Sequence, residues 1–352
     1  MSDQEQTTAK KSPNSFISKL GSLKDKLNQK FNKSLKVATP MRQPRIGLAL
    51  GCGGAKALVH MGVIKAFEEN DIPIHAIAGC SMGAYVGALW ATGHDSKQMI
   101  AIASEFKDKE SFKKLADPAV PPIKGLFHGN RLKSHLEGFI SDPQIQDLDR
   151  DFIAIAANLD NYQRVVFNSG SLLDAVHASC AMPGIIVPVT VNGIRCVDGG
   201  VVDPVPVGSL RDYLDVDIII AVSTTPELSD IEAAEPVITI EEVAPTNEGD
   251  SWLRTKINSI GKKYNPAAKG NMLDTLRRSL KASQIRIAHD ACMRADLALH
   301  PITEETAWHQ YEKFAHFIEV GEKTTLVAMP EIKKLLEPIP DIKDESEEND
   351  GK

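Results

Sequence analysis

The chain has 352 residues, of which 42% are hydrophobic and 25% are charged, and its formal net charge is −7. This length and composition can bury a large core, so we exclude disorder throughout, and the average Gly and Pro content without short repeats excludes collagen-like and solenoid architectures. Five cysteines without a CxxC pair argue against a disulfide framework or a structural zinc site, and the acidic balance argues against a nucleic-acid partner.

Residues 1–43 predict a basic N-terminal arm. Residues 1–45 carry ten Lys and Arg against three Asp and Glu, and apolar side chains recur at helical spacing within 14–36, interleaved with lysines. Such an amphipathic helix can lie on an anionic membrane surface, which predicts a peripheral contact with the inner membrane surface. Docking of the arm on its own domain or on a partner is the alternative. The polar first residues lack the apolar core of a secretion signal, which favours a cytoplasmic location.

Residues 44–336 alternate between strand and helix patterns, which is typical of an α/β fold with parallel strands. The first two strands, 45–50 and 74–78, each run into a glycine turn and then a helix. The pattern predicts further strands at 152–157, 163–168, 185–191, 217–222 and 297–300. It predicts helices at 55–70, 84–92, 131–140, 172–181, 272–294 and 308–336.

The second glycine turn carries the first chemical motif. Gly79, Ser81 and Gly83 form a GxSxG between an apolar strand and a helix. In a nucleophile elbow the glycines flank the serine because the tight turn crowds any side chain there, and the turn presents the serine hydroxyl at the carboxyl end of the sheet. We therefore predict that Ser81 is a catalytic nucleophile.

A serine that attacks a carbonyl needs donors for the developing oxyanion. Gly51, Cys52, Gly53 and Gly54 end the first strand and open a helix, so their backbone N–H groups can converge on one negative oxygen. A nucleotide-binding loop is the competing interpretation, but GxGxxG would need Gly where Lys56 stands, and no Walker motif is present.

The serine also needs a base, and two kinds of candidate are present. A late histidine would complete an ordinary hydrolase triad, but the late histidines do not follow glycine-rich strand ends; these are His289, His300, His309 and His316. Asp198, by contrast, lies in a VDGG sequence after an apolar strand, where Gly199 and Gly200 permit close backbone approach. A Ser81–Asp198 dyad would require a direct hydrogen bond and partial burial of the carboxylate.

Three motifs in this order, GCGGAK at 51–56, GCSMG at 79–83 and DGG at 198–200, resemble the patatin-like phospholipases. The resemblance is to the bacterial branch, which is similar to the catalytic domain of neuropathy target esterase, and it extends over about residues 44–335. It implies a three-layer α/β/α sandwich with a mostly parallel central sheet. It also implies lipid acyl hydrolysis by a Ser–Asp dyad without a metal or cofactor, on a phospholipid or other fatty-acyl ester.

The chain departs from the family pattern at two places. Lys56 and Ala57 stand where the family usually has Arg-Gly, and His177 stands where it usually has Arg. Lysine keeps the charge but loses the planar fork, and alanine restricts the backbone if its φ must be positive.

Two segments complete the predicted organisation. Residues 225–270 are irregular and suggest a flap over the site or a second membrane contact, with a plain surface excursion as the alternative. Residues 337–352 predict an acidic disordered tail. Two other functions stay open at this point: a soluble carboxylesterase or thioesterase, and a non-catalytic regulatory protein that keeps the fold.

Overall fold

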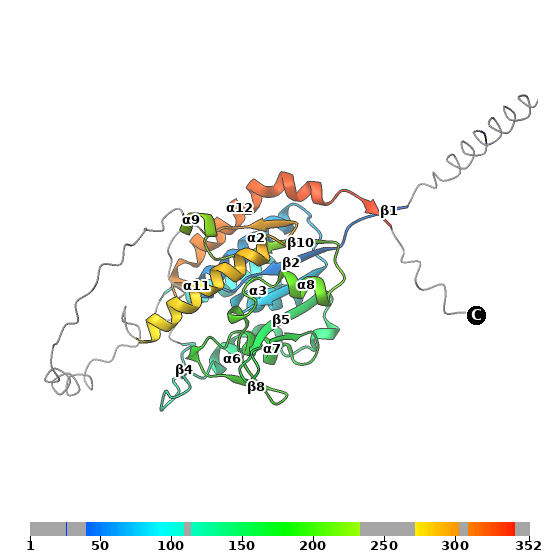
Figure 1. The fold of residues 1–352 in the computed structure, drawn as a ribbon. Helices are drawn as coiled ribbons and strands as arrows, with labels where there is room; N and C mark the ends of the chain where they lie inside the picture. Colours follow the sequence, from blue (N-terminus) through cyan, green and yellow to red (C-terminus); the bar gives the residue numbers. More distant parts are fainter. Residues whose placement is uncertain (1–25, 27–39, 109–113, 233–271, 303–308, 342–352) are drawn as a thin grey trace, which may run out of the picture. The chain divides into compact units, whose positions relative to one another are not determined.

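The computed structural model describes residue 26 and residues 40–108, 114–232, 272–302 and 309–341 (Figure 1). The amphipathic segment 14–36, apart from Lys26, and residues 233–270 of the predicted flap lie outside the described residues. The chain divides into two compact units, Met1–Gln43 together with Pro338–Lys352, and Pro44–Glu337.

The first unit contains a two-stranded antiparallel pairing. Strand β1, Met41–Arg42, pairs with β12, Ile339–Pro340, and Arg42 lies 3.6 Å from the Asp341 carboxylate. The segment predicted as a disordered tail therefore begins with an ordered strand. The prediction was wrong for these residues because it weighed their composition and could not see a partner strand at Met41–Arg42.

The second unit is built on one central sheet. Within the described residues, eight strands form this sheet, and five of them run parallel in the order β11-β10-β2-β3-β5. These five are β2 Ile46–Leu50, β3 Ala76–Cys80, β5 Asp151–Asn158, β10 Ile218–Val222 and β11 Leu297–Leu299. The predicted α/β class with a mostly parallel sheet is confirmed.

The remaining strands run antiparallel at one edge or form a small separate sheet. Strands β6 Arg164–Phe167 and β9 Ile194–Asp198 both pair with β5, and β8 Val189–Val191 pairs with β9. Strand β7 Gly184–Ile186 pairs instead with β4 Gly125–Phe127. The single strand predicted at 185–191 is therefore two strands in two sheets. Pro188 lies between them and, lacking an N–H, cannot continue a ladder.

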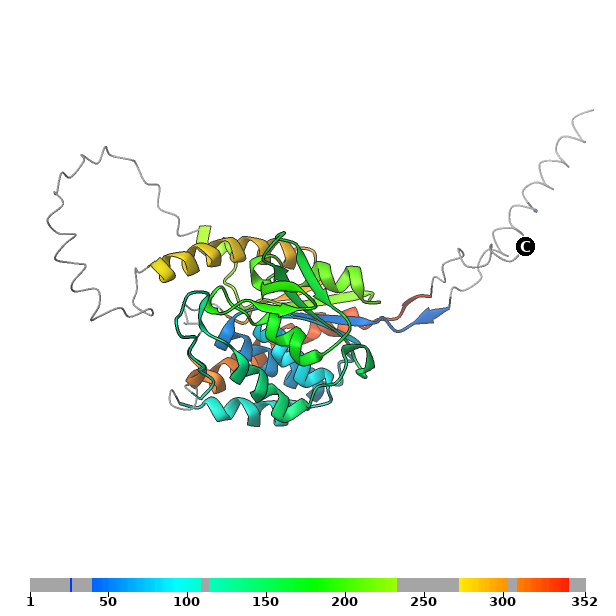
Figure 2. The same cartoon turned by 90° about the horizontal axis from the view of Figure 1, so that it is seen from below.

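Helices cover both faces of the sheet, as Figures 1 and 2 show. Alternate strand residues point to opposite faces: Leu48 and Leu50 enter a large apolar cluster with the helices on one side, and Ala49 enters a second cluster on the other. The first side carries α2 Val59–Glu69, α3 Met82–Ala91, α4 Ser96–Ala103 and α12 Phe314–Leu335. The second side carries α8 Val207–Tyr213 and α11 Met272–Cys292.

Three further helices complete the described elements, namely α6 Asn130–Ile140, α7 Leu172–Ser179 and α9 Leu228–Glu232. Every helix predicted within 44–336 has a counterpart, although the first begins as a 3₁₀ turn over Gly54–Leu58 and the last begins at Phe314. Three short helices were not predicted: α4, α8 and α9, which have eight, seven and five residues. No helix in the described part of the chain is both long and apolar enough to cross a membrane.

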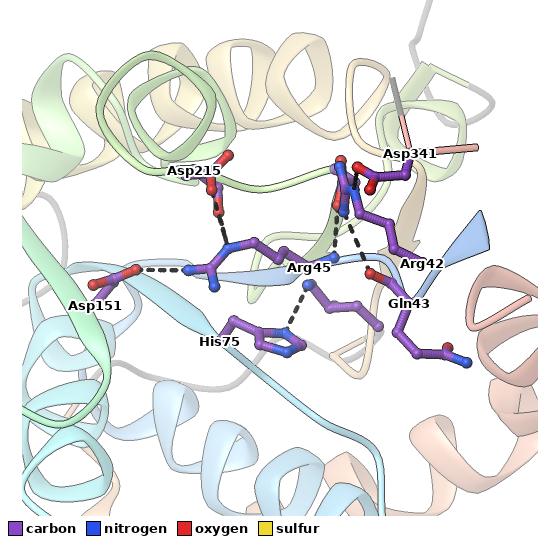
Figure 3. Close-up of polar contacts among 9 residues, drawn as sticks. Arg42, Gln43, Arg45, His75, Asp151, Asp215 and Asp341 are labelled. Atoms are coloured by element: carbon purple, nitrogen blue, oxygen red, sulfur yellow. Dashed lines mark hydrogen bonds and ion pairs between the residues drawn. The ribbon is translucent and has the colours of Figure 1, made fainter. Parts of the chain in front are cut away.

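The amino ends of the parallel strands are held together by one arginine (Figure 3). Arg45, next to β2, places a guanidinium nitrogen 3.0 Å from the Asp151 carboxylate at the start of β5. Its Nε donates to the carbonyl oxygen of Asp215, before β10, at 2.8 Å. The N–H of Ile46 donates to Nδ1 of His75, before β3, at 3.0 Å. These contacts fix the amino edge of the sheet and leave the carboxyl edge for the functional residues.

Candidate active site

Ser81 lies at the sharp turn between β3 and α3. Its φ is 55° and its ψ is −127°, a backbone conformation that non-glycine residues rarely adopt and that is often found at functional sites. The flanking glycines make the turn feasible: a Cβ on Gly83 would lie 2.3 Å from the carbonyl oxygen of Leu50, and one on Gly79 would lie 2.4 Å from the Cα of Ala84. The predicted elbow geometry is therefore present in the backbone.

Asp198, the last residue of β9, meets Ser81 across the carboxyl edge of the sheet. The Ser81 hydroxyl donates to Asp198 Oδ2 at 2.5 Å, although the two residues are 117 positions apart. The other carboxylate oxygen accepts the N–H of Gly200 at 2.8 Å. The structure thus brings the predicted nucleophile and base into direct contact.

The environment of Asp198 changes its acidity. Its side chain is only 4% exposed, and this burial raises the pKa to about 6, although hydrogen bonds from Ser81 and Gly200 act in the opposite direction. Burial disfavours the charged carboxylate, while donors favour it. A carboxylate with a pKa near 6 is ionised at neutral pH and is a stronger base than an ordinary aspartate.

A serine supports the elbow from a neighbouring helix. Ser179, at the end of α7, accepts the backbone N–H of Ser81 at 2.8 Å and donates its own hydroxyl to the carbonyl oxygen of Ile155 at 2.6 Å. This side chain is fully buried. The amide of Ser81 is therefore already bonded, so donors for an oxyanion must come from elsewhere.

Two of the four predicted oxyanion donors in the first glycine loop have other hydrogen-bond partners. The N–H of Gly51 donates to Val222 O at 3.0 Å, and that of Cys52 donates to Pro204 O at 2.8 Å. These two amides hold the loop against β10 and against the segment before α8, so they are not free to donate to an oxyanion. Gly53 and Gly54 line the same pocket as Ser81 and Asp198, as does Cys52. The oxyanion role stays a prediction for Gly53 and Gly54.

The departures from the family pattern do not distort the loop. Ala57 lies within the 3₁₀ turn Gly54–Leu58, and its φ is not positive, so no glycine is needed there. Lys56 is 7% exposed and donates to Thr224 O at 2.8 Å. Burial, and to a lesser extent the nearby charge of Lys281, lowers its pKa to about 8. His177 is also buried, which lowers its pKa, and its Nε2 lies 3.3 Å from His128 O.

The pocket around Ser81 is lined by both apolar and polar side chains. Met182, Pro183 and Val201 give it apolar surface, together with Leu280 from α11. The polar residues of its lining, beyond the motif residues, are Lys56, Thr224, Thr225, Arg277, Lys281 and Gln284. Among the described residues that line the pocket there is no histidine, so the late-histidine alternative has no geometric support.

The contribution of α11 to the pocket was not predicted from the sequence. The helix itself was predicted without a function. Four of its residues line the pocket, namely Arg277, Leu280, Lys281 and Gln284. Their spacing of three to four residues places them on one helix face, which could have been predicted together with the helix. The position of that face over the site could not have been predicted, because it depends on tertiary contacts.

The cysteines near the site are buried thiols. All five cysteines of the chain are buried and free. Burial raises the pKa of Cys80 and Cys180 well above the ordinary range, and it raises the pKa of Cys292 to about 11. Because a thiol reacts as its thiolate, these cysteines are poor nucleophiles, which agrees with Ser81 as the central residue of the elbow.

The comparisons with known proteins agree with this geometry. Residues 48–211 match the family model "Patatin-like phospholipase", and this span includes the elbow and the DGG motif. Residues 48–211 are thus similar to a patatin-like phospholipase domain, and the described fold and the two glycine turns agree with this similarity.

Relatives by sequence come from two groups. An uncharacterized NTE family protein of Mycobacterium tuberculosis is 32% identical over 232 residues, which cover 66% of this chain and 61% of that protein. A lysophospholipase NTE1 of Yarrowia lipolytica is 26% identical over 285 residues, which cover 79% of this chain and 19% of that protein. The chain thus spans about three fifths of the mycobacterial relative and a much smaller share of the fungal one.

Solved structures show weaker likeness. VipD from Legionella pneumophila matches with a TM-score of 0.39 and 13% identity, covering 84% of this chain and 68% of that chain. Human GIVD cytosolic phospholipase A2 matches with a TM-score of 0.41 and 11% identity, covering 83% of this chain and 59% of that chain. At such low TM-scores these likenesses carry no argument about activity.

Proposed function

We propose that this protein is a lipid acyl hydrolase of the phospholipase A or lysophospholipase type that cleaves carboxylic esters through the Ser81–Asp198 dyad. The hydrogen bond of 2.5 Å between Ser81 Oγ and Asp198 Oδ2, at the base of a pocket with apolar and cationic surface, carries this proposal. The family match and the lysophospholipase relative support it.

The proposed reaction proceeds in two halves. Asp198 accepts the proton of Ser81 while the serine oxygen attacks the ester carbonyl, and the amides of Gly53 and Gly54 donate to the oxyanion. Collapse of this intermediate breaks the ester bond, and the proton on Asp198 passes to the leaving alcohol. Water then loses a proton to Asp198 and attacks the acyl-serine ester. Collapse of the second intermediate breaks the bond to Ser81, the proton on Asp198 returns to the Ser81 oxygen, and the fatty acid leaves. No metal or cofactor takes part in this cycle.

We also propose roles for the predicted segments. Residues 44–336 would form the catalytic domain of a cytoplasmic protein, and residues 1–43 would be an arm that contacts the inner membrane surface. The assignment of residues 337–352 as an acidic tail stays a prediction for the part of this segment that follows strand β12. Because the chain spans only 61% of its mycobacterial relative, these assignments concern this chain and not the whole of any relative.

The direct test compares wild type with Ser81→Ala. Wild type should hydrolyse a short-chain nitrophenyl ester and release fatty acid from mixed phospholipids, as identified by mass spectrometry, and the variant should lose at least about 10³-fold in rate. Circular dichroism of the variant checks that it is folded. Equal activity of the two proteins would move the chemistry away from the elbow.

A second measurement separates the two open alternatives. Labelling of Ser81 by a fluorophosphonate probe would exclude a non-catalytic regulatory protein, because only an activated serine reacts. A soluble carboxylesterase or thioesterase would be labelled but would leave phospholipids intact. Product analysis therefore decides the substrate class, and the probe decides whether the site is active.

A further inference from the structure

Two large apolar side chains project from a turn beside the pocket. Val120 is 85% exposed and Ile123 is 82% exposed, and the residues between and after them, Pro121, Pro122 and Lys124, are also exposed. Exposed apolar side chains are ordinary when scattered, but adjacent ones on a single turn mark a contact surface.

The base of this turn is firmly anchored. The Asp117 carboxylate accepts the N–H groups of Gly129 and Asn130 at 2.9 and 2.8 Å, which fixes the start of α6. The N–H of Ala119 donates to Leu126 O at 2.9 Å, and Ala119 itself is buried. The turn is therefore held in place while its apolar tip remains uncovered.

The pairing of β4 with β7 brings the turn close to the lining of the pocket. The two strands are parallel, with Gly125 opposite Gly184. Pro183, the residue before β7, lines the pocket, and Lys124 is the residue before β4. Because the strands are parallel, the turn that ends at Lys124 enters the pair from the same end as this residue of the pocket lining.

The N-terminal half of α11 provides a second apolar and basic surface at the mouth of the pocket. Leu280 lines the pocket and is 37% exposed, and Leu276, one turn earlier, is 54% exposed. In both views the turn before β4 and the start of α11 lie on the same side of the domain (Figures 1 and 2). We define the docking rim as five exposed residues and the half-buried Lys281 on both sides of the mouth: Val120, Ile123, Lys124, Leu276, Leu280 and Lys281.

The charge of the rim is opposite in sign to that of the whole chain. The first half of α11 carries Arg277, Arg278 and Lys281 against one carboxylate, Asp274, which pairs with both arginines. Lys124 adds a further cation beside the tip. The chain as a whole has a net charge of −7, so this local excess of cations favours an anionic partner over a neutral or basic one. Exposed apolar side chains next to cations are the combination that suits an anionic lipid surface.

We propose that the docking rim seats the protein on the surface of a bilayer that contains anionic lipid. Val120 and Ile123 enter the acyl boundary, Lys124 and Lys281 contact anionic head groups, and the pocket opens toward the lipid. The proposal rests on the proposed function, because a lipid hydrolase must take its substrate from such a surface. It is separate from the predicted arm, since every residue of the rim belongs to Pro44–Glu337.

The first experiment places a reporter at the tip of the turn in the full chain. Ile123→Cys is labelled with an environment-sensitive fluorophore, and Val327→Cys is the matched control because Val327 is 83% exposed on α12. The native cysteines are buried, so the introduced thiol should react first. Adding phosphatidylcholine vesicles that contain phosphatidylglycerol should shift the emission of the label at 123 to the blue and allow quenching by doxyl lipids. The label at 327 should not respond.

A label at 123 that stays in water, or that responds no more than the label at 327, would overturn the proposal even if the arm binds the vesicles. A concentration-dependent shift without vesicles would also overturn it and indicate a second copy of the chain as the occupant. The arm cannot produce a false positive at 123, because quenching by doxyl lipids reports the depth of the labelled position itself.

The second experiment compares two substrates. Val120→Asp with Ile123→Asp should reduce hydrolysis of vesicle lipid at least about tenfold relative to hydrolysis of a soluble nitrophenyl ester, because charge opposes insertion. Val327→Asp should leave that ratio as in wild type, and melting temperatures check folding. Insertion of position 123 without fluorophosphonate labelling of Ser81 would support docking and refute the proposed hydrolase. Labelling of Ser81 without insertion of position 123 would support the proposed hydrolase and refute docking through the rim.

Discussion

The two glycine turns at the carboxyl edge of the sheet are constrained in different ways. At the elbow, a Cβ on Gly83 would meet backbone atoms of Leu50, which cannot move without displacing β2. At the first loop, a Cβ on Gly53 would meet the side chain of Thr224, at 2.2 Å from its Oγ1. The φ of Gly53 is 168°, an extended value open to any residue. Space at Gly83 is thus limited by main chain, whereas space at Gly53 is limited by a side chain that can be exchanged.

This difference indicates where such a site can vary. The elbow must keep its glycines because no neighbouring substitution can make room for a side chain. The loop can adapt, and it already does so with Lys56 and Ala57 in place of the usual Arg-Gly. We therefore expect variation in substrate preference at the loop and not at the elbow.

The largest expected effect is that of Gly83→Ala. The added methyl group would lie 2.3 Å from Leu50 O, so the variant should lose about 3 kcal/mol in the free energy of unfolding and at least about 10³-fold in activity. Gly138→Ala in α6 is the matched control, because nothing lies within 4 Å of its Cβ, and it should gain about 0.5 to 1 kcal/mol. Thermal unfolding measures the stability of the two variants, and ester hydrolysis measures their activity. An active, stable Gly83→Ala protein would show that the elbow is less rigid than its backbone contacts indicate.

A smaller, repairable effect is expected at the loop. Gly53→Ala should reduce kcat by about 10²-fold, because the displaced amide no longer meets the oxyanion. Adding Thr224→Ala removes the clashing side chain and should recover at least about tenfold of that loss. Steady-state kinetics of the single and double variants test this coupling. Purely additive losses would mean that Gly53 and Thr224 do not constrain each other.

The smallest expected effect is the response to pH. Asp198 must be ionised to accept a proton, and its pKa is about 6, so kcat/KM should fall about tenfold per unit as the pH decreases below 6. Lys56 has a pKa of about 8 and loses its charge above that value, which should give a second decline with an anionic substrate. In Lys56→Arg the upper decline should disappear, since a guanidinium stays charged. A lower midpoint near 4 would contradict the effect of burial on Asp198.

The sequence was sufficient for the parts of the site that depend on local geometry. Glycines around Ser81 and after Asp198 are required by the turns themselves, so their spacing predicted two strand ends and the residues they present. The meeting of these residues was inferred from chemistry and resemblance. It depends on the pairing of β9 with β5, which no local pattern encodes.

The rest depended on long-range contacts. The amides of Gly51 and Cys52 were predicted as oxyanion donors, but carbonyl groups of Val222 and Pro204 accept them, and these partners are more than 150 residues away in the chain. The position of α11 over the pocket likewise depends on contacts between residues that are far apart in the chain. Helix α4, by contrast, could have been predicted from local sequence, because Asp95 and Gln98 form a capping box at its start.

The burial of every cysteine has a practical consequence for studying motion in this protein. A thiol reagent can modify a buried cysteine only when the surrounding structure opens, so the modification rate is a clock for local opening. Cys52 and Cys80 lie in and beside the glycine turns, whereas Cys196 lies on β9. Mass spectrometry of timed alkylation would therefore rank the rates of local opening of these regions in the unsubstituted chain.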